Sequence, residues 1–211
     1  MLVIGLLGGV GSGKSLVAQE FVRLSAAHVD ADKLGHQVLE TSDVRDSLRN
    51  YFGSEVISPQ GNVDRAFLAR KVFSQSDSQA KAHLRYLEQQ THPRIRALMQ
   101  QELERLQSQS CPVAVLDAPV MLEAGWDRQC DALVFVAAPR AVRLERVLRR
   151  GWQEADFSAR EAAQESLDEK RRHADVIIDN SHTLACTRAQ VERYWRSLFD
   201  TPPLTRRSSS P

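Results

Sequence analysis

The chain has 211 residues, 42% hydrophobic and 26% charged, which is typical of a globular protein with one α/β domain and a compact insertion. Its 28 basic and 27 acidic residues leave a formal net charge of +1, which argues against a nucleic-acid partner. The three cysteines, Cys111, Cys130 and Cys186, form neither a disulfide framework nor a zinc motif. The apolar runs are too short to span a bilayer. We therefore expect a cytoplasmic protein with no membrane association.

Four short runs that are apolar at nearly every position, and a strand tip at Val29-Asp30-Ala31-Asp32, predict five strands. They lie at residues 2–7, 29–32, 113–117, 133–136 and 176–179. Continuous apolar runs suit strands that are covered on both faces, as in parallel sheets. Asp32 and Asp117 stand at predicted carboxyl ends of strands, the edge where open α/β sheets bind ligands.

Helical patterns separate these strands. Apolar residues at helical spacing predict three inward faces: Val17, Phe21 and Leu24; then Ile95, Leu98, Met99, Leu103 and Leu106; and last Val191, Tyr194, Trp195, Leu198 and Phe199. Pro93 is expected at the first position of the second helix. The alternation of strands and helices predicts an α/β fold of three layers around a five-stranded parallel sheet.

Two stretches interrupt this alternation. Residues 33–110 are almost all helical, far longer than one crossover requires, and residues 149–172 are polar and densely charged. We expect a core of residues 1–32, 111–148 and 173–200, an inserted helical substrate domain at 33–110 and a helical, mobile lid at 149–172. Residues 201–211 lack apolar periodicity and are predicted to be disordered.

A phosphate-binding motif follows the first strand. Residues 8–15, GGVGSGKS, match G-x-x-x-x-G-K-[ST] at every fixed position. The alternative is a chance glycine-rich turn, which occurs in about 1 in 100 chains of this length, and a strand before and a helix after make it rarer. Glycines let backbone N–H groups cradle phosphates, a lysine reaches the β- and γ-phosphates, and a serine ligates Mg²⁺. The residues expected to bind ATP are Gly9, Val10, Gly11, Ser12, Gly13, Lys14, Ser15 and Leu16.

The remaining features favour a small-molecule kinase. The chain has no N-K-x-D segment, which GTPases need to read the base. A kinase must exclude water from ATP, which suits a charged lid. Asp117, after the third strand, resembles the acidic residue that holds the Mg²⁺ shell, so Ser15 and Asp117 are the expected metal residues.

Two features have alternative interpretations at this stage. Asp32 can act as the base for an attacking hydroxyl, or it can be the N-cap of a helix beginning at Lys33. Arginines crowd one predicted helix at positions 140, 143, 146, 149 and 150, with 143, 146 and 150 expected on one face. Such a run either forms a solvated face or stabilises charge on a transferring phosphoryl group.

In order along the chain, these residues resemble the dephospho-coenzyme A kinase family. The elements are GGVGSGKS at 8–15, Asp30-Ala31-Asp32 followed by His36, Gly61-Asn62-Val63-Asp64-Arg65, Thr91-His92-Pro93, Asp117-Ala118-Pro119-Val120-Met121-Leu122-Glu123, the lid with its exit from Arg146 to Asp175, and Ile178-Asp179-Asn180. The chain departs from the family at Leu16, where Thr is common, and at Gly151-Trp152, where an acidic residue is common.

The resemblance implies transfer of the ATP γ-phosphate to the ribose 3′-hydroxyl of dephospho-coenzyme A, giving coenzyme A and ADP, with ATP and Mg²⁺ bound. It implies Lys14 as phosphate-binding residue, Asp32 as base and Arg146 as lid arginine, all catalytic. The acceptor-side domain contains Asp64, Arg65 and His92. These residues either contact the substrate or, as we slightly favour, support the structure. Asp32 is also expected to contact the acceptor.

Two other functions remain as alternatives. One is a kinase for another small acceptor, such as a nucleoside, nucleotide or sugar acid. The other is a non-catalytic nucleotide-gated regulator. In either case we expect a monomer or small homo-oligomer.

Overall fold

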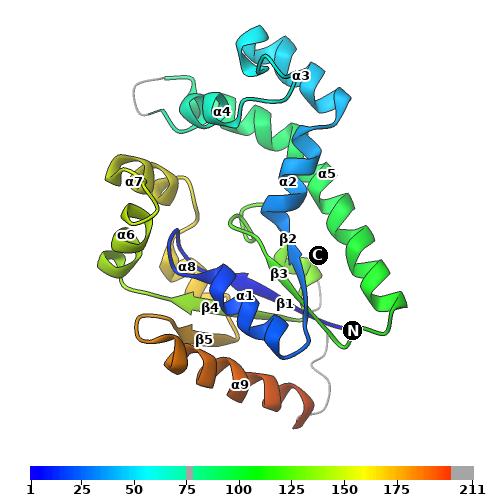
Figure 1. Cartoon of the computed structure of the whole chain (residues 1–211), viewed down its shortest axis with the longest axis vertical. Helices are drawn as coiled ribbons and strands as arrows, with labels where there is room; N and C mark the ends of the chain where they lie inside the picture. Colours follow the sequence, from blue (N-terminus) through cyan, green and yellow to red (C-terminus); the bar gives the residue numbers. More distant parts are fainter. Residues whose placement is uncertain (75–77, 201–211) are drawn as a thin grey trace. The chain divides into compact units, whose positions relative to one another are not determined.

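The computed structural model describes residues 1–74 and 78–200, so the disorder predicted for 201–211 lies outside the described residues. The chain divides into two compact units (Figure 1). The first consists of Met1–Ala31 and the chain from Gln101 onward, and the second of Asp32–Gln100. None of the helices in the described part has the length and apolar character needed to cross a membrane.

The first unit contains a five-stranded parallel sheet, as predicted. Its strands are β1 (Leu2–Leu7), β2 (Ala27–Asp30), β3 (Val113–Asp117), β4 (Ala132–Ala137) and β5 (Val176–Asp179). Their order is β2-β3-β1-β4-β5, so β1 lies between β3 and β4 in the middle of the sheet. The connections from β1 and β3 leave in opposite directions along the sheet, which makes the carboxyl end of β1 a topological switch point. The glycine motif begins there.

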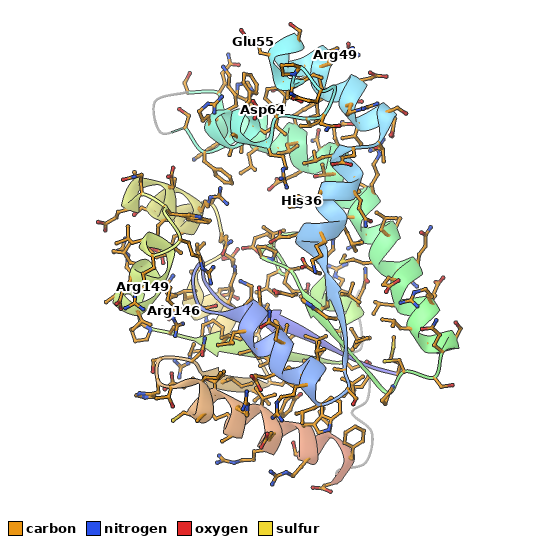
Figure 2. All side chains as sticks on the ribbon, in the orientation of Figure 1. His36, Arg49, Glu55, Asp64, Arg146 and Arg149 are labelled. Carbon is orange, nitrogen blue, oxygen red and sulfur yellow. The ribbon has the colours of Figure 1, made fainter. Side chains whose placement is uncertain are left out.

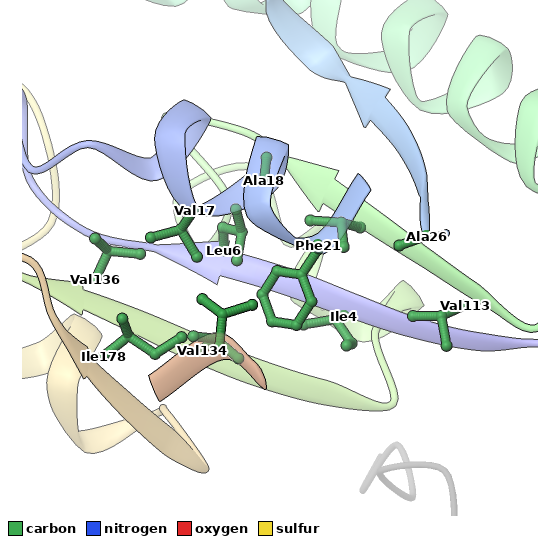
Figure 3. Close-up of a cluster of buried hydrophobic side chains, with 12 residues drawn as sticks. Ile4, Leu6, Val17, Ala18, Phe21, Ala26, Val113, Val134, Val136 and Ile178 are labelled. Carbon is green, nitrogen blue, oxygen red and sulfur yellow. The ribbon is translucent and has the colours of Figure 1, made fainter. Parts of the chain in front are cut away.

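Helices of the first unit cover this sheet. They are α1 (Lys14–Arg23), α6 (Arg140–Leu148), α7 (Glu154–Ala162), α8 (Leu167–Arg172) and α9 (Leu184–Asp200), with a 3-10 turn, η2, at Asp127–Gln129. One face of the sheet packs on α1, where Val17 and Phe21 are fully buried against Ile4 and Val134 (Figure 3). The predicted inward face of α1 is therefore confirmed. Burial of these side chains stabilises the fold by about 1.5–3 kcal/mol each.

Helix α9 packs beside α1 on the same core. Val191 is fully buried and Tyr194, Trp195 and Leu198 pack against the cluster, as predicted. The prediction for Phe199 is wrong: it is 59% exposed, because it lies at the end of the helix, beyond the sheet residues that bury Val191. Arg188 donates two hydrogen bonds to the buried Glu20 of α1, at 2.8 and 3.1 Å, and holds the pKa of that carboxyl below its usual value.

The second unit is helical. It contains α2 (Ala31–Leu39, which begins at the last residue of the first unit), α3 (Ser42–Phe52), the 3-10 turn η1 (Ser54–Val56), α4 (Arg65–Val72) and most of α5 (Ala80–Ser108), which continues into the first unit. Val44, Leu48 and Val56 are fully buried. The rings of Tyr51 and Tyr86 stack at 3.8 Å, joining α3 to α5.

The expected position of Pro93 is wrong, because Pro93 lies inside α5. A proline there removes one backbone hydrogen bond from the helix. Side chains supply other donors to the preceding turn: Thr91 Oγ1 donates to the Leu87 carbonyl at 2.8 Å, and Arg94 Nη1 to the Gln90 carbonyl at 2.7 Å. The apolar residues after Pro93 are inward as predicted, with Ile95 and Met99 buried.

The second strand ends earlier than expected. Strand β2 stops at Asp30, and α2 begins at Ala31, so Asp32 lies in the first turn of a helix instead of at the end of a strand. The N-cap interpretation of Asp32 is also wrong, because the helix starts two residues before Lys33. Acidic residues are favourable in a first helical turn, where they complement the helix dipole.

Candidate active site

The glycine motif forms a loop between β1 and α1. Gly13 is the N-cap of α1 with φ of 92°, a left-handed conformation that glycine adopts without strain. Ser12 N donates to the Gly9 carbonyl at 3.1 Å, and Lys14 Nζ donates to the Gly8 carbonyl at 3.3 Å, so the ammonium group lies across the loop. Leu16 follows in the first turn of α1, half-buried. The positive end of α1 therefore faces the loop, which suits an anion.

The two expected metal residues are in direct contact. Ser15 Oγ donates to Asp117 Oδ2 at 3.0 Å, because Asp117 ends β3, the immediate neighbour of β1 in the sheet. A hydroxyl and a carboxylate fit Mg²⁺, which prefers oxygen ligands and completes its shell with water and substrate phosphates. No cluster of three or more His, Cys, Asp or Glu that could hold a metal exists among residues 1–74 and 78–200. His28 Nε2 lies 3.9 Å from the same Asp117 oxygen.

Two arginines of α6 contact the outside of the loop. Arg143, only 2% exposed, donates to the Val10 carbonyl at 3.2 Å and to the Ala138 carbonyl at 3.1 Å. Arg146 donates to the Ser12 carbonyl at 3.1 Å and to the Asn180 carbonyl at 2.6 Å. Both side chains therefore place positive charge beside the loop while their N–H groups bind its backbone.

The other arginines of this run differ from the prediction. Helix α6 ends at Leu148, so Arg149 and Arg150 lie beyond it, and the expected shared face of residues 143, 146 and 150 is wrong for Arg150, which is exposed. Arg149 is 76% exposed on the outer side of the segment (Figure 2) and pairs with Glu145 at 2.5 Å. The solvated-face interpretation therefore holds for Arg149 and Arg150, but not for Arg143.

The predicted lid segment, residues 149–172, is part of the first unit and contacts the rest of that unit at two places. In α7, Glu161 pairs with Arg143 at 2.6 Å, and the fully buried Phe157 ring lies 5.5 Å from the same guanidinium. In α8, Lys170 is 1% exposed and pairs with Glu123 at 3.0 Å. Removing one partner of such a buried pair typically costs about 3–5 kcal/mol. Contacts with Arg143 thus connect α7 to the phosphate loop.

The acceptor-side candidates lie in the second unit. Asp64 is the N-cap of α4 and accepts from Phe67 N at 2.9 Å, a structural contact. Arg65 is exposed, and its Nη1 lies 2.7 Å from His36 Nε2. Because guanidinium only donates, the His36 nitrogen is the acceptor. Asp32 lies one helical turn before His36 on α2, and His92 lies inside α5, half-buried.

Two residues that the sequence does not assign to the site contact the loop directly, and a third holds the lid segment. Arg143 touches the loop backbone, Asn180 donates to the Ser12 carbonyl at 2.7 Å, and Lys170 fixes the end of the lid segment. Spacing alone does not reveal these contacts, because each partner is a backbone carbonyl or a distant carboxylate. Asn180 directly follows β5, a position at the same sheet edge as the loop, and this was the available indication.

Known proteins resemble this chain along most of its length. A family model described as dephospho-CoA kinase matches residues 2–185. Two curated proteins named dephospho-CoA kinase are similar: that of Symbiobacterium thermophilum is 40% identical, covering 93% of this chain and 81% of the relative, and that of Syntrophotalea carbinolica is 42% identical, covering 90% and 89%. The solved structure of TT1252 from Thermus thermophilus matches with a TM-score of 0.78 at 31% identity, covering 94% of this chain and 97% of that one.

The site and the relatives agree. The loop, its lysine and the Ser15–Asp117 contact are parts of an ATP-dependent phosphotransferase on a P-loop kinase fold. The family match covers the loop, the second unit and the lid segment together. The chain therefore belongs to the dephospho-CoA kinase family, whose members use ATP to phosphorylate an alcohol group of dephospho-CoA.

Proposed function

We propose that the chain transfers the γ-phosphate of ATP in line to the ribose 3′-hydroxyl of dephospho-CoA, with residues 9–16 binding the triphosphate. The observation that carries this proposal is the loop at the switch point of the sheet, with Lys14 across it and Ser15 bonded to Asp117. Little covalent chemistry is required of the protein in such a transfer, since positioning and electrostatics supply most of the rate.

The nucleotide side of the site has three roles. Lys14 would exchange its bond to the Gly8 carbonyl for the β- and γ-phosphate oxygens, neutralising charge that develops there. Ser15 and Asp117 would hold Mg²⁺ with the phosphates, the serine directly and the carboxylate through water. When bound, the ion supplies charge stabilisation on the transferring group.

We assign the role of base to Asp32. It follows Asp30 by two residues, which span at most about 7 Å, and Asp30 is in register with Asp117 across β2 and β3. A carboxylate there can orient the acceptor hydroxyl and accept its proton. Arg146 would stabilise charge on the transferring phosphoryl group, held beside the loop by its bonds to two carbonyls.

The acceptor would be bound by the helical insertion, residues 33–110, and covered by the lid, residues 149–172, while residues 1–32, 111–148 and 173–200 form the nucleotide core. In the insertion we propose Arg65 as a contact to the anionic part of the acceptor, next to His36. Asp64 would act with it mainly by capping α4, and His92 would support the helix around Pro93. We further propose a cytoplasmic monomer or small homo-oligomer that binds neither membrane nor nucleic acid.

An acceptor panel tests this function. ADP release is measured with ATP, Mg²⁺ and either dephospho-CoA, a nucleoside, a nucleotide, shikimate or a sugar acid. Dephospho-CoA alone should give rapid release, and the product should carry a 3′-phosphate. A comparable rate with another acceptor would support a different small-molecule kinase, and tight ATP binding without transfer to any acceptor would support a nucleotide-gated regulator. Omitting Mg²⁺ should abolish transfer.

A further inference from the structure

The carbonyl of Ser12 is held on the outer side of the phosphate loop by two donors. Asn180 Nδ2 donates to it at 2.7 Å and Arg146 Nη1 at 3.1 Å. Asn180 is 1% exposed, so this bond forms away from water. Hydrogen bonds to buried carbonyls fix a backbone segment because leaving the group unpaired costs about 1–3 kcal/mol.

The Asn180 amide is itself fixed in one orientation. Thr187 Oγ1 donates to Asn180 Oδ1 at 2.8 Å, and Thr187 is fully buried. Because the amide oxygen accepts from Thr187, the amide NH₂ must face Ser12. The Asn180 backbone is anchored as well: its N–H donates to the Ala137 carbonyl at 2.8 Å, and its carbonyl accepts from Arg146.

Peptide geometry transmits this contact to the inside of the loop. In a planar trans peptide the carbonyl of one residue and the N–H of the next point in opposite directions. A Ser12 carbonyl held outward therefore turns the Gly13 N–H inward. A side chain on Gly13 would not fit, since its Cβ would lie 2.2 Å from Asn180 Nδ2.

The Gly13 N–H is available to a ligand. No acceptor is paired with it in the part of the chain that the structure describes, residues 1–74 and 78–200. An unpaired N–H at the start of α1 points at the space where an anion is favourable.

We propose that Asn180, oriented by Thr187, is a positioning residue for the phosphates of ATP, acting by fixing the Ser12–Gly13 peptide. It donates to the loop and not to the nucleotide. This inference deepens the proposed function, on which it rests, and concerns the phosphate chain only, not the base or the acceptor.

Three variants of the full-length chain test this role. Asn180→Asp replaces the donor by an oxygen that repels the Ser12 carbonyl, Thr187→Val removes the orienting hydroxyl at constant shape, and Gln190→Ala is the matched control. Gln190 holds the end of the same strand through hydrogen bonds of 2.9 and 2.8 Å to the Asp179 backbone. Among the described residues it forms no hydrogen bond to the loop. The measurements are the KM for ATP, the Ki of inorganic tripolyphosphate, the KM for dephospho-CoA and Tm.

We expect Asn180→Asp to raise both the KM for ATP and the Ki of tripolyphosphate about tenfold, and Thr187→Val about threefold, since one hydrogen bond is worth roughly that factor. The KM for dephospho-CoA should stay unchanged. Gln190→Ala should lower Tm while leaving both nucleotide-side constants unchanged. Thr187→Val keeps the test usable if Asn180→Asp does not fold.

Two results would overturn the proposal. The first is a lower Tm with unchanged affinity for ATP and tripolyphosphate in Thr187→Val and Asn180→Asp, which makes Asn180 merely structural. The second is a raised KM for ATP with an unchanged Ki of tripolyphosphate, which moves its action to the base or ribose. If wild-type protein binds ATP but fails to phosphorylate dephospho-CoA, the proposed acceptor is wrong, and equilibrium binding of ATP and tripolyphosphate still decides the role of Asn180.

Discussion

The two units of this chain build their candidate sites from different atoms. In the first unit the phosphate site is made mainly of main-chain groups between Gly8 and Ser15, supported from outside by Arg143, Arg146 and Asn180. In the second unit the candidates are side chains on helices, and one of them, Asp64, is occupied in capping its own helix.

This difference determines how each site responds to substitution. A main-chain site tolerates changes of surrounding side chains as long as the peptide planes keep their directions, and it fails when a supporting contact or the lysine is lost. A side-chain site depends on each functional group individually. In the first unit, substitutions at a few positions should therefore cause large losses of activity. In the second unit, substitutions should cause moderate changes, and neighbouring residues should differ in whether activity or stability is affected.

Replacing the loop lysine should have the largest effect. Lys14→Ala removes the only side-chain charge of the motif, so we expect kcat/KM to fall by roughly 10³-fold or more, while Tm changes little because the ammonium is partly solvent-exposed. Steady-state ADP release and thermal melting are the two measurements. Near-normal turnover in this variant would show that the loop is not the phosphate site, and the comparison between the two units would then be wrong.

Asp32→Asn should have the next largest effect. The amide keeps the size of the side chain but cannot accept the proton, so turnover should fall about 10²-fold while the affinity for ATP is kept. Rates measured from pH 6 to pH 9, with ATP binding measured separately, test this. If the rate is unchanged, Asp32 serves only the first turn of α2. In that case the second unit supplies no catalytic group.

Much of the first unit could be predicted from sequence, and less of the second. Strands β1, β3, β4 and β5 were predictable because they are apolar at nearly every position, and the loop because its glycine and lysine spacing has few other uses. The end of β2 was not predictable, because the sequence Asp30-Ala31-Asp32 fits the end of a strand and the start of a helix equally well. Helix α5 runs through Pro93, although a proline usually begins or interrupts a helix, and no local pattern reveals this continuation.

The site shows the same limit. Lys14, Ser15 and Asp117 were predictable because a motif and a strand end fix their positions. The role of Asn180 depends on a carbonyl 168 positions away in the sequence, and tertiary structure alone brings the two together. The motif thus identifies the loop and its lysine, whereas the residues that support the loop from behind can be found only from the fold.

Two adjacent residues of the second unit should separate structural from functional roles. Asp64→Ala removes the N-cap of α4 and should lower the free energy of unfolding by about 1 kcal/mol without changing the KM for dephospho-CoA. Arg65→Met should leave stability nearly unchanged, because the side chain is exposed, and should raise that KM about tenfold or more, since a hydrogen bond to a charged group is worth about 1.5–3 kcal/mol. Urea unfolding and acceptor titrations measure both. Asp64→Asn, which can still cap, is the control, and equal KM values in all three variants would remove Arg65 from the acceptor site.

The smallest effect is expected at a core tyrosine of the first unit, where stability should change without any change at the site. Tyr194 Oη is buried and has no hydrogen-bond partner among the described residues, and burial, with a smaller contribution from the Asp175 charge, raises the pKa of Tyr194 to about 12. Tyr194→Phe should therefore leave the free energy of unfolding at pH 7 unchanged or raise it by up to about 1 kcal/mol. Above pH 10 the unfolded chain releases the tyrosine proton while the folded chain keeps it, so the wild type loses up to about 1.4 kcal/mol per pH unit through this group between pH 10 and 12.

The Tyr194→Phe variant does not show this loss of stability at high pH, because it has no tyrosine hydroxyl to titrate. Urea unfolding of both proteins at pH 7 and pH 10.5 therefore isolates the contribution of Tyr194 as a difference, because all other titrating groups are shared. The KM for ATP at pH 7 should be the same in both, since Tyr194 packs on Phe21 in the core and not on the loop. A variant that is less stable than wild type at pH 7 by more than 1 kcal/mol would show that the hydroxyl has a partner in solution. A changed KM would show that packing under α1 is coupled to the main-chain site, so that the site does not tolerate changes in the core beneath it.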